Sequence, residues 1–127
     1  MPELDQARIL VVEDEAIIAL EMESILRRAS CEVVACASVS TALQAADEQK
    51  FDAAVLDLNL RGEMSFPIAD ALARKNIPFI FVSGYDVDIV PRGHRRRPFV
   101  GKPFLSQMLL TTLCETVRNA QPLATSA

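Results

Sequence analysis

The chain has 127 residues, of which 50% are hydrophobic and 24% are charged. This length and composition favour one packed domain and exclude disorder throughout the chain. With 13 basic and 17 acidic residues, its net charge of -4 disfavours general nucleic-acid binding, because phosphate backbones need a positive surface.

The three cysteines, Cys31, Cys36 and Cys114, match neither a CxxC pair nor a zinc pattern, which favours reduced, inert thiols. Residues 1–5 are acidic and lack the apolar run of a signal peptide. The apolar runs elsewhere are too short to cross a membrane. We therefore expect a cytoplasmic protein without membrane contact.

Five short apolar runs, taken in chain order, predict buried strands. Their apolar character is continuous instead of alternating, which is typical of parallel strands that are covered on both faces. A helix-like stretch follows most of them. The runs are 9–12, 33–36, 53–56, 79–82 and 98–100.

Between these runs the hydrophobic period becomes helical. Residues 18–29 carry an apolar stripe at helical spacing, and residues 40–50 predict a second helix. Ser65 is a plausible N-cap for a third helix, which ends before Asn76. Residues 105–117 carry the apolar stripe of the last helix.

The segment 84–97 does not fit this alternation clearly. It has room for one helical turn around 86–90, but Pro91 and Gly93 make a long helix there improbable. We therefore expect a short or mobile fourth helix between the fourth and fifth strands.

The order of elements predicts an α/β fold with a parallel sheet and helices on both faces. This unit uses the whole chain, with a core of about 7–119, and leaves no linker or repeat. We therefore expect residues 1–127 to form a single domain.

Polar side chains follow four of the predicted strands: Glu13 and Asp14 after the first, Asp57 after the third, Ser83 after the fourth, and Lys102 shortly after the fifth. Ligands of open α/β sheets bind at the carboxyl ends of the strands, so these side chains should share one pocket. Three close carboxylates repel each other unless a cation is present, and oxygen ligands suit Mg²⁺. A carboxylate beside a metal ion and an ammonium group is prepared to accept a phosphoryl group.

Each of these residues, taken alone, also has a purely structural interpretation. Asp14 is a typical helix cap, Ser83 a typical turn residue, and Lys102 an ordinary solvated lysine. Their joint occurrence at four strand ends favours the functional interpretation.

The residues resemble the receiver domain of two-component response regulators, and the resemblance extends from Ala7 to about Asn119. It implies a doubly wound, five-stranded sheet with strand order 2-1-3-4-5, as in the flavodoxin and CheY-like folds. The matching segments are Leu-Val-Val-Glu-Asp-Glu at 10–15, Asp-Leu-Asn-Leu-Arg-Gly at 57–62, Val-Ser-Gly at 82–84 and Phe-Val-Gly-Lys-Pro-Phe at 99–104.

This resemblance implies that Asp57 accepts a phosphoryl group from a histidine kinase or a phosphotransfer protein. Glu13 and Asp14 would hold Mg²⁺ together with Asp57 and the backbone carbonyl of Asn59. Pro103 would follow Lys102 through a cis peptide bond. The resemblance also implies a phosphoprotein of a phosphorelay, which catalyses its own phosphotransfer and dephosphorylation and is not an ordinary enzyme.

Ser83 and Lys102 would contact the phosphoryl oxygens, and Phe99 stands at the position of the aromatic switch residue. Ser83 replaces the more frequent threonine. The segment 78–85 is similar to a branch of receivers with a Phe-Ala-Thr-Gly-Tyr-like motif, in which the fourth helix can be poorly formed. Tyr85 is therefore a second candidate for the switch.

The expected output is a change in protein–protein contacts through the surface of residues 84–117, without direct DNA binding.

Two alternatives remain: a phosphate sink that drains a kinase, and a receiver-like interaction module that is never phosphorylated. A hydrolase with an aspartyl nucleophile is disfavoured because Asn59 stands where a second carboxylate would be needed. A nucleotide-binding module is disfavoured because no GxGxxG motif occurs. The basic run 94–97 favours a solvated loop or a docking patch for an acidic partner.

Overall fold

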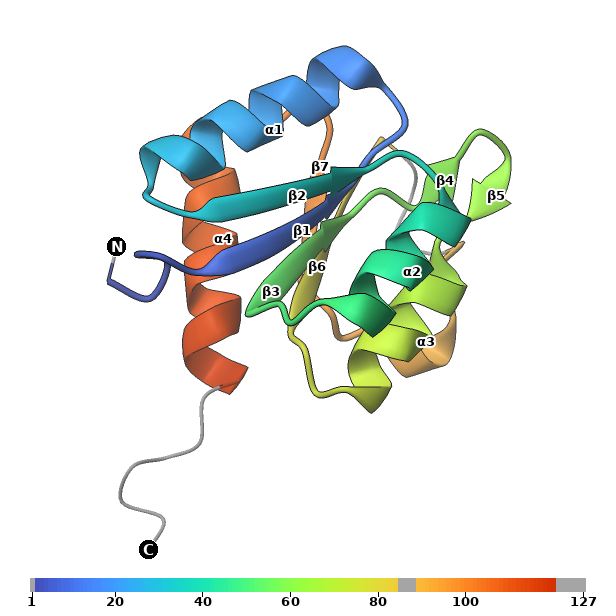
Figure 1. Cartoon of the computed structure of the whole chain (residues 1–127). Helices are drawn as coiled ribbons and strands as arrows, with labels where there is room; N and C mark the ends of the chain where they lie inside the picture. The colour runs from blue at the N-terminus through green and yellow to red at the C-terminus, as the bar shows by residue number, and fades with distance from the viewer. Residues whose placement is uncertain (1, 85–88, 121–127) are drawn as a thin grey trace, which may run out of the picture.

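The computed structural model describes residues 2–84 and 89–120 (Figure 1). Five strands form a parallel sheet in the order β2-β1-β3-β6-β7. This confirms the predicted order 2-1-3-4-5, because β4 and β5 form a separate hairpin. The strands of the sheet are β1 (Arg8–Val12), β2 (Glu32–Cys36), β3 (Ala53–Leu56), β6 (Phe79–Ser83) and β7 (Phe99–Gly101).

Helices cover both faces of the sheet, as the doubly wound prediction requires. Figure 1 shows α1 and α4 on one face and α2 and α3 on the other. No helix within the described ranges is long and apolar enough to cross a membrane. The helices are α1 (Ala16–Arg28), α2 (Val39–Glu48), α3 (Phe66–Arg74) and α4 (Ser106–Ala120).

Alternate residues of each strand enter two separate cores. In β1, Leu10 and Val12 pack on the side of α2 and α3, whereas Ile9 and Val11 pack on the side of α1 and α4. Because both faces are buried, both sets of alternate positions must be apolar. This explains why the strands are continuous apolar runs in the sequence.

The hairpin between β3 and α3 was not predicted. β4 (Asn59–Leu60) and β5 (Glu63–Met64) pair in antiparallel fashion around a loop of Arg61 and Gly62. Both loop residues have positive φ, 55° for Arg61 and 90° for Gly62. Left-handed backbone is natural for glycine but costs about 1 kcal/mol for a residue such as arginine.

The described residues between β6 and β7 include a 3-10 turn, η2 (Arg92–His94), and no α-helix. The expectation of a short or mobile fourth helix stays a prediction, because part of this segment lies outside the described residues. Most of the helical turn expected around 86–90 lies outside the described residues, and so does Tyr85.

The expectation of a solvated basic loop at 94–97 is wrong for His94. Its side chain is buried, its Nε2 lies 2.7 Å from Oδ1 of Asp70, and its ring contacts Phe79 and Phe81 edge to face. The Arg97 guanidinium lies 4.4 Å from the centre of the Phe79 ring. The imidazole of His94 therefore packs against both phenyl rings, and the guanidinium of Arg97 covers that of Phe79.

We expect His94→Ala to lower the free energy of unfolding by about 2 kcal/mol, because it removes both ring contacts and the bond to Asp70. The exposed Arg92 of the same turn serves as the control, and Arg92→Ala should change stability by less than about 0.5 kcal/mol. Urea denaturation measures both values. Equal effects of the two substitutions would contradict the anchoring role of His94.

Candidate functional site

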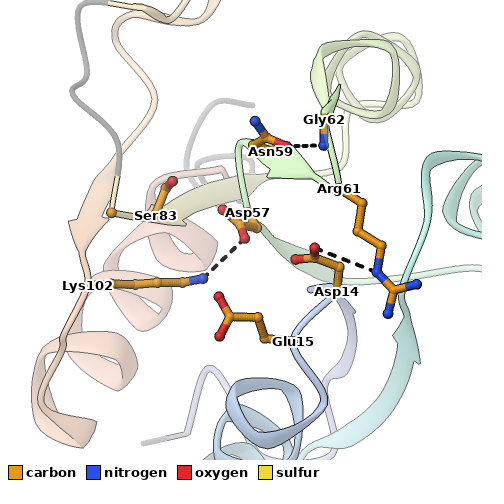
Figure 2. A pocket seen from close by; sticks show the side chains of 9 residues that line it. Asp14, Glu15, Asp57, Asn59, Arg61, Gly62, Ser83 and Lys102 are labelled. Carbon is orange, nitrogen blue, oxygen red and sulfur yellow. Dashed lines mark hydrogen bonds and ion pairs between the residues drawn. The ribbon is translucent and has the colours of Figure 1, made fainter.

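The carboxyl ends of four strands bring the five expected polar side chains into one region. Glu13 and Asp14 follow β1, Asp57 follows β3, Ser83 ends β6, and Lys102 follows β7. A pocket of about 540 Å³ lies at this edge (Figure 2). Its walls are formed by Asp14, Glu15, Asp57, Asn59, Arg61, Gly62, Ser83, Gly84 and Lys102.

Backbone hydrogen bonds extend the sheet by one step and fix three of these residues. The N–H of Glu13 donates to the carbonyl of Cys36 at 3.0 Å, and the N–H of Asp57 donates to that of Val12 at 2.9 Å. Similarly, the N–H of Lys102 donates to the carbonyl of Ser83 at 3.0 Å. The side chains therefore start from rigid positions at the strand ends.

The three carboxylates form a compact acidic group. Glu13, Asp14 and Asp57 each offer one oxygen, and these oxygens lie within 4.8 Å of one another. Glu13 is only 2% exposed and Asp57 only 6%. Charges buried at such distances require cations, because water screens them poorly.

Lys102 supplies one of these cations. Its Nζ lies 2.5 Å from Oε1 of Glu13 and 3.1 Å from Oδ2 of Asp57. Burial alone would lower the pKa of Lys102. The contacts of its ammonium group with Glu13 and Asp57 outweigh this effect and raise the pKa above its usual value. The ammonium group is therefore charged at neutral pH. The peptide bond to Pro103 is cis, as expected.

One ammonium does not neutralise the acidic group. Burial raises the pKa of Glu13 from 4.5 to about 7, and the charge of Asp57 adds to the effect. The hydrogen bonds from Lys102 and from the backbone N–H of Glu15 oppose this rise. Near neutral pH the pocket therefore has an excess of negative charge, which a proton or a metal cation can relieve.

The hairpin contributes three residues, Asn59, Arg61 and Gly62, to the rim of the pocket. Oδ1 of Asn59 accepts a hydrogen bond from the N–H of Gly62 at 2.6 Å, which holds the hairpin loop. Nε of Arg61 lies 4.0 Å from Oδ2 of Asp14, and the Arg61 side chain is 79% exposed. Figure 2 shows Arg61 and Lys102 reaching the acidic group from opposite sides.

Arg61 was not among the residues expected at the site. A signal for it exists in the sequence, because Gly62 at the second position of a short loop is typical of a two-residue hairpin. Such a hairpin after Asp57 returns the chain toward the strand ends, and its first loop residue then projects over the pocket.

Ser83 and Phe99 lie on neighbouring strands. Ser83 is almost fully buried and pairs with Gly101 in the register of β6 and β7. Phe99 pairs with Phe81 and is half-buried against the core on the side of α2 and α3. Ser83 and Phe99 therefore belong to adjacent, hydrogen-bonded strands, and Phe99 stands two residues before the partner of Ser83.

The fold and this pocket agree with comparisons to known proteins. Residues 9–113 match the family described as response regulator receiver domain. The chain belongs to this family, and it is a receiver of the two-component type.

Solved structures show the same architecture. The solution structure of SdrG from Sphingomonas melonis is 38% identical, covers 93% of this chain and 99% of its own, and superimposes with a TM-score of 0.78. The crystal structure of a response regulator receiver protein from Sinorhizobium medicae is 25% identical, with coverages of 93% and 99% and a TM-score of 0.83.

A curated relative is much longer. The sensory/regulatory protein RpfC of Xanthomonas campestris is 26% identical over 132 residues, which include 94% of this chain but only 18% of RpfC. The chain therefore spans less than a fifth of the length of the curated relative that it matches.

We expect the metal-free protein to lose stability as the pH rises. The pKa of Glu13 is raised to about 7 in the folded chain from 4.5, so its favourable contribution is complete below 4.5 and is lost as the pH rises through 7. The loss between about pH 5 and pH 8 should be on the order of 2 kcal/mol. Chemical denaturation in the presence of a chelator measures it.

Glu13→Gln is the matched variant, because the amide keeps the shape of the side chain and does not ionise. It should flatten the pH dependence over the same range. A wild-type stability that is constant or increases from pH 5 to pH 8 would contradict the assignment.

Proposed function

We propose that the chain is the phosphoryl acceptor of a two-component signalling system, with Asp57 as the accepting residue. The observation that carries the proposal is the position of the Asp57 carboxylate. It is buried at the end of β3, 3.1 Å from the Lys102 ammonium and within 4.8 Å of the oxygens of Glu13 and Asp14. Among the three carboxylates, Asp57 comes from the central strand of the sheet.

In the proposed reaction an oxygen of Asp57 attacks the phosphorus of a phosphohistidine. The new O–P bond forms as the P–N bond breaks, and the imidazole nitrogen takes the electron pair of that bond. The product on the protein is an acyl phosphate. Attack by water at the phosphorus later releases inorganic phosphate and restores the carboxylate.

The donor set fits Mg²⁺, because it consists of carboxylate oxygens with an excess of negative charge. Glu13, Asp14, Asp57 and the backbone carbonyl of Asn59 are the residues that would hold the ion. When bound, the ion supplies positive charge to the oxygens of the transferring group.

Two other side chains of the pocket would contact the phosphoryl group itself. Lys102, which bridges Glu13 and Asp57 in the unmodified protein, would turn its ammonium to a phosphoryl oxygen. The hydroxyl of Ser83 would donate to a second oxygen. These contacts form only after transfer. The phosphorylated protein therefore favours a position of the β6 end that differs from its position in the unmodified protein.

The proposed output surface consists of residues 84–117. Movement of Ser83 toward the phosphoryl group changes the start of this segment, and Phe99 on the adjacent strand follows as the aromatic switch. Reversing a 1:99 population needs about 5.5 kcal/mol, which two or three charge-assisted hydrogen bonds at about 1.5–3 kcal/mol each supply. Tyr85, the second candidate for the switch, lies outside the described residues.

The family supports a histidine kinase or a phosphotransfer protein as the upstream partner. We propose that residues 1–127 act as one receiver domain whose output is protein–protein contact, and that the chain is an acceptor and not a turnover enzyme. A phosphate sink uses the same chemistry. It differs in having no partner that prefers the phosphorylated form.

Phosphorylation is tested by incubation with Mg²⁺ and acetyl phosphate, followed by intact mass spectrometry. We expect the mass of one phosphoryl group to be added to the wild-type chain. Asp57→Asn should show no addition, since an amide oxygen is a poor nucleophile, and chelation of Mg²⁺ should abolish it in the wild type. Unchanged wild-type mass, here and with phosphorylated kinases as donors, would favour the interaction module that is never phosphorylated.

Lys102→Ala tests the link between the phosphoryl group and the output surface. Beryllium fluoride, a phosphoryl mimic, should shift the NMR resonances of residues 89–117 in the wild-type chain. In the variant these shifts should shrink severalfold, because the cation that senses the mimic is missing, while Mg²⁺ is still bound. Equal loss of the shifts and of Mg²⁺ binding would show that the role of Lys102 is misassigned.

A further inference from the structure

Arg61 occupies a backbone conformation that arginine rarely adopts. Its φ of 55° lies in the left-handed region, where asparagine, aspartate and glycine are favoured in two-residue hairpins. The hairpin is nevertheless well supported, since the Asn59 side chain bonds the N–H of Gly62 at 2.6 Å. An arginine thus stands at a loop position where the backbone favours glycine, asparagine or aspartate.

The side chain of Arg61 makes its ion pair at the pocket. Its Nε lies 4.0 Å from Oδ2 of Asp14, and most of the side chain is exposed at the rim. Glu13 and Asp57 share Lys102, so Arg61 is the cation paired with the third carboxylate. The two cations thus divide the acidic group between them.

The two cations, Lys102 and Arg61, differ in how firmly they are held. Lys102 is largely buried, with only 15% of its side chain exposed, whereas the Arg61 side chain is 79% exposed. An exposed ion pair at 4.0 Å is weak and exchanges readily with solvent. Arg61 can therefore leave Asp14 without disturbing the core, and its guanidinium then remains at the mouth of the pocket.

We propose that Arg61 is a positioning residue with two alternating partners: the carboxylate of Asp14 in the metal-free pocket, and the anionic phosphoryl donor once Asp14 serves as a metal ligand. The inference rests on the proposed function. In the first position Arg61 competes with Mg²⁺ for Asp14. In the second position Arg61 attracts the negatively charged donor toward Asp57, because a guanidinium group binds phosphate oxygens well.

The two positions give the substitution Arg61→Ala effects of opposite sign. Mg²⁺ should bind about threefold more tightly, because a competing positive charge is removed from Asp14. Phosphorylation by acetyl phosphate at saturating Mg²⁺ should become about fivefold slower, because the donor loses its counter-charge at the rim. A variant that is merely misfolded would lose both properties.

The experiment measures the Mg²⁺ Kd by isothermal titration calorimetry and the phosphorylation rate by intact mass spectrometry. Arg61→Lys keeps the charge and should stay close to the wild type in Mg²⁺ affinity. Arg28→Ala is the matched control, since it removes an exposed arginine at the end of α1 that lies away from the pocket, and both readouts should stay at the wild-type value. High salt should reduce the difference in Mg²⁺ affinity between the wild type and Arg61→Ala.

An Arg61→Ala variant whose Mg²⁺ affinity is unchanged or weaker would overturn the inference, and so would an unchanged rate with acetyl phosphate. In either case the wild-type protein would still bind Mg²⁺ and accept the phosphoryl group, and the proposed function would stand. A wild-type chain that binds no Mg²⁺ would overturn the proposed function, and this inference with it.

Discussion

The bridge from Lys102 to Glu13 and Asp57 is the interaction on which the site depends. It joins side chains from three strands that are far apart in the sequence, and it holds two buried carboxylates next to each other. Such a group is stable only while its charges are compensated. The pocket can therefore exchange one set of positive charges for another, which the proposed phosphoryl transfer requires.

The parallel sheet makes this arrangement possible. Apolar side chains on both faces bury the strands, so polar groups accumulate where the strands end. Backbone hydrogen bonds of Glu13, Asp57 and Lys102 to neighbouring strands then fix the pocket as a continuation of the sheet. The two cores thus contribute to function by holding the ends of the strands in register.

Most of the fold could be predicted from the sequence, because continuous apolar runs have few other uses in a chain of this size. The grouping of Glu13, Asp57 and Lys102 followed from topology, since parallel strands place their carboxyl ends at one edge. The hairpin with Arg61 was missed because its strands are only two residues long and carry no alternating pattern. His94 was misjudged because its burial comes from Phe79 and Phe81, which are distant in sequence.

The hairpin forms a small sheet of its own, separate from the five-stranded one. A substitution in its loop therefore leaves the strand pairing of the main sheet untouched. On the proposed role of Arg61, a substitution at this loop position would alter ion binding and donor attraction while the main sheet stays as it is.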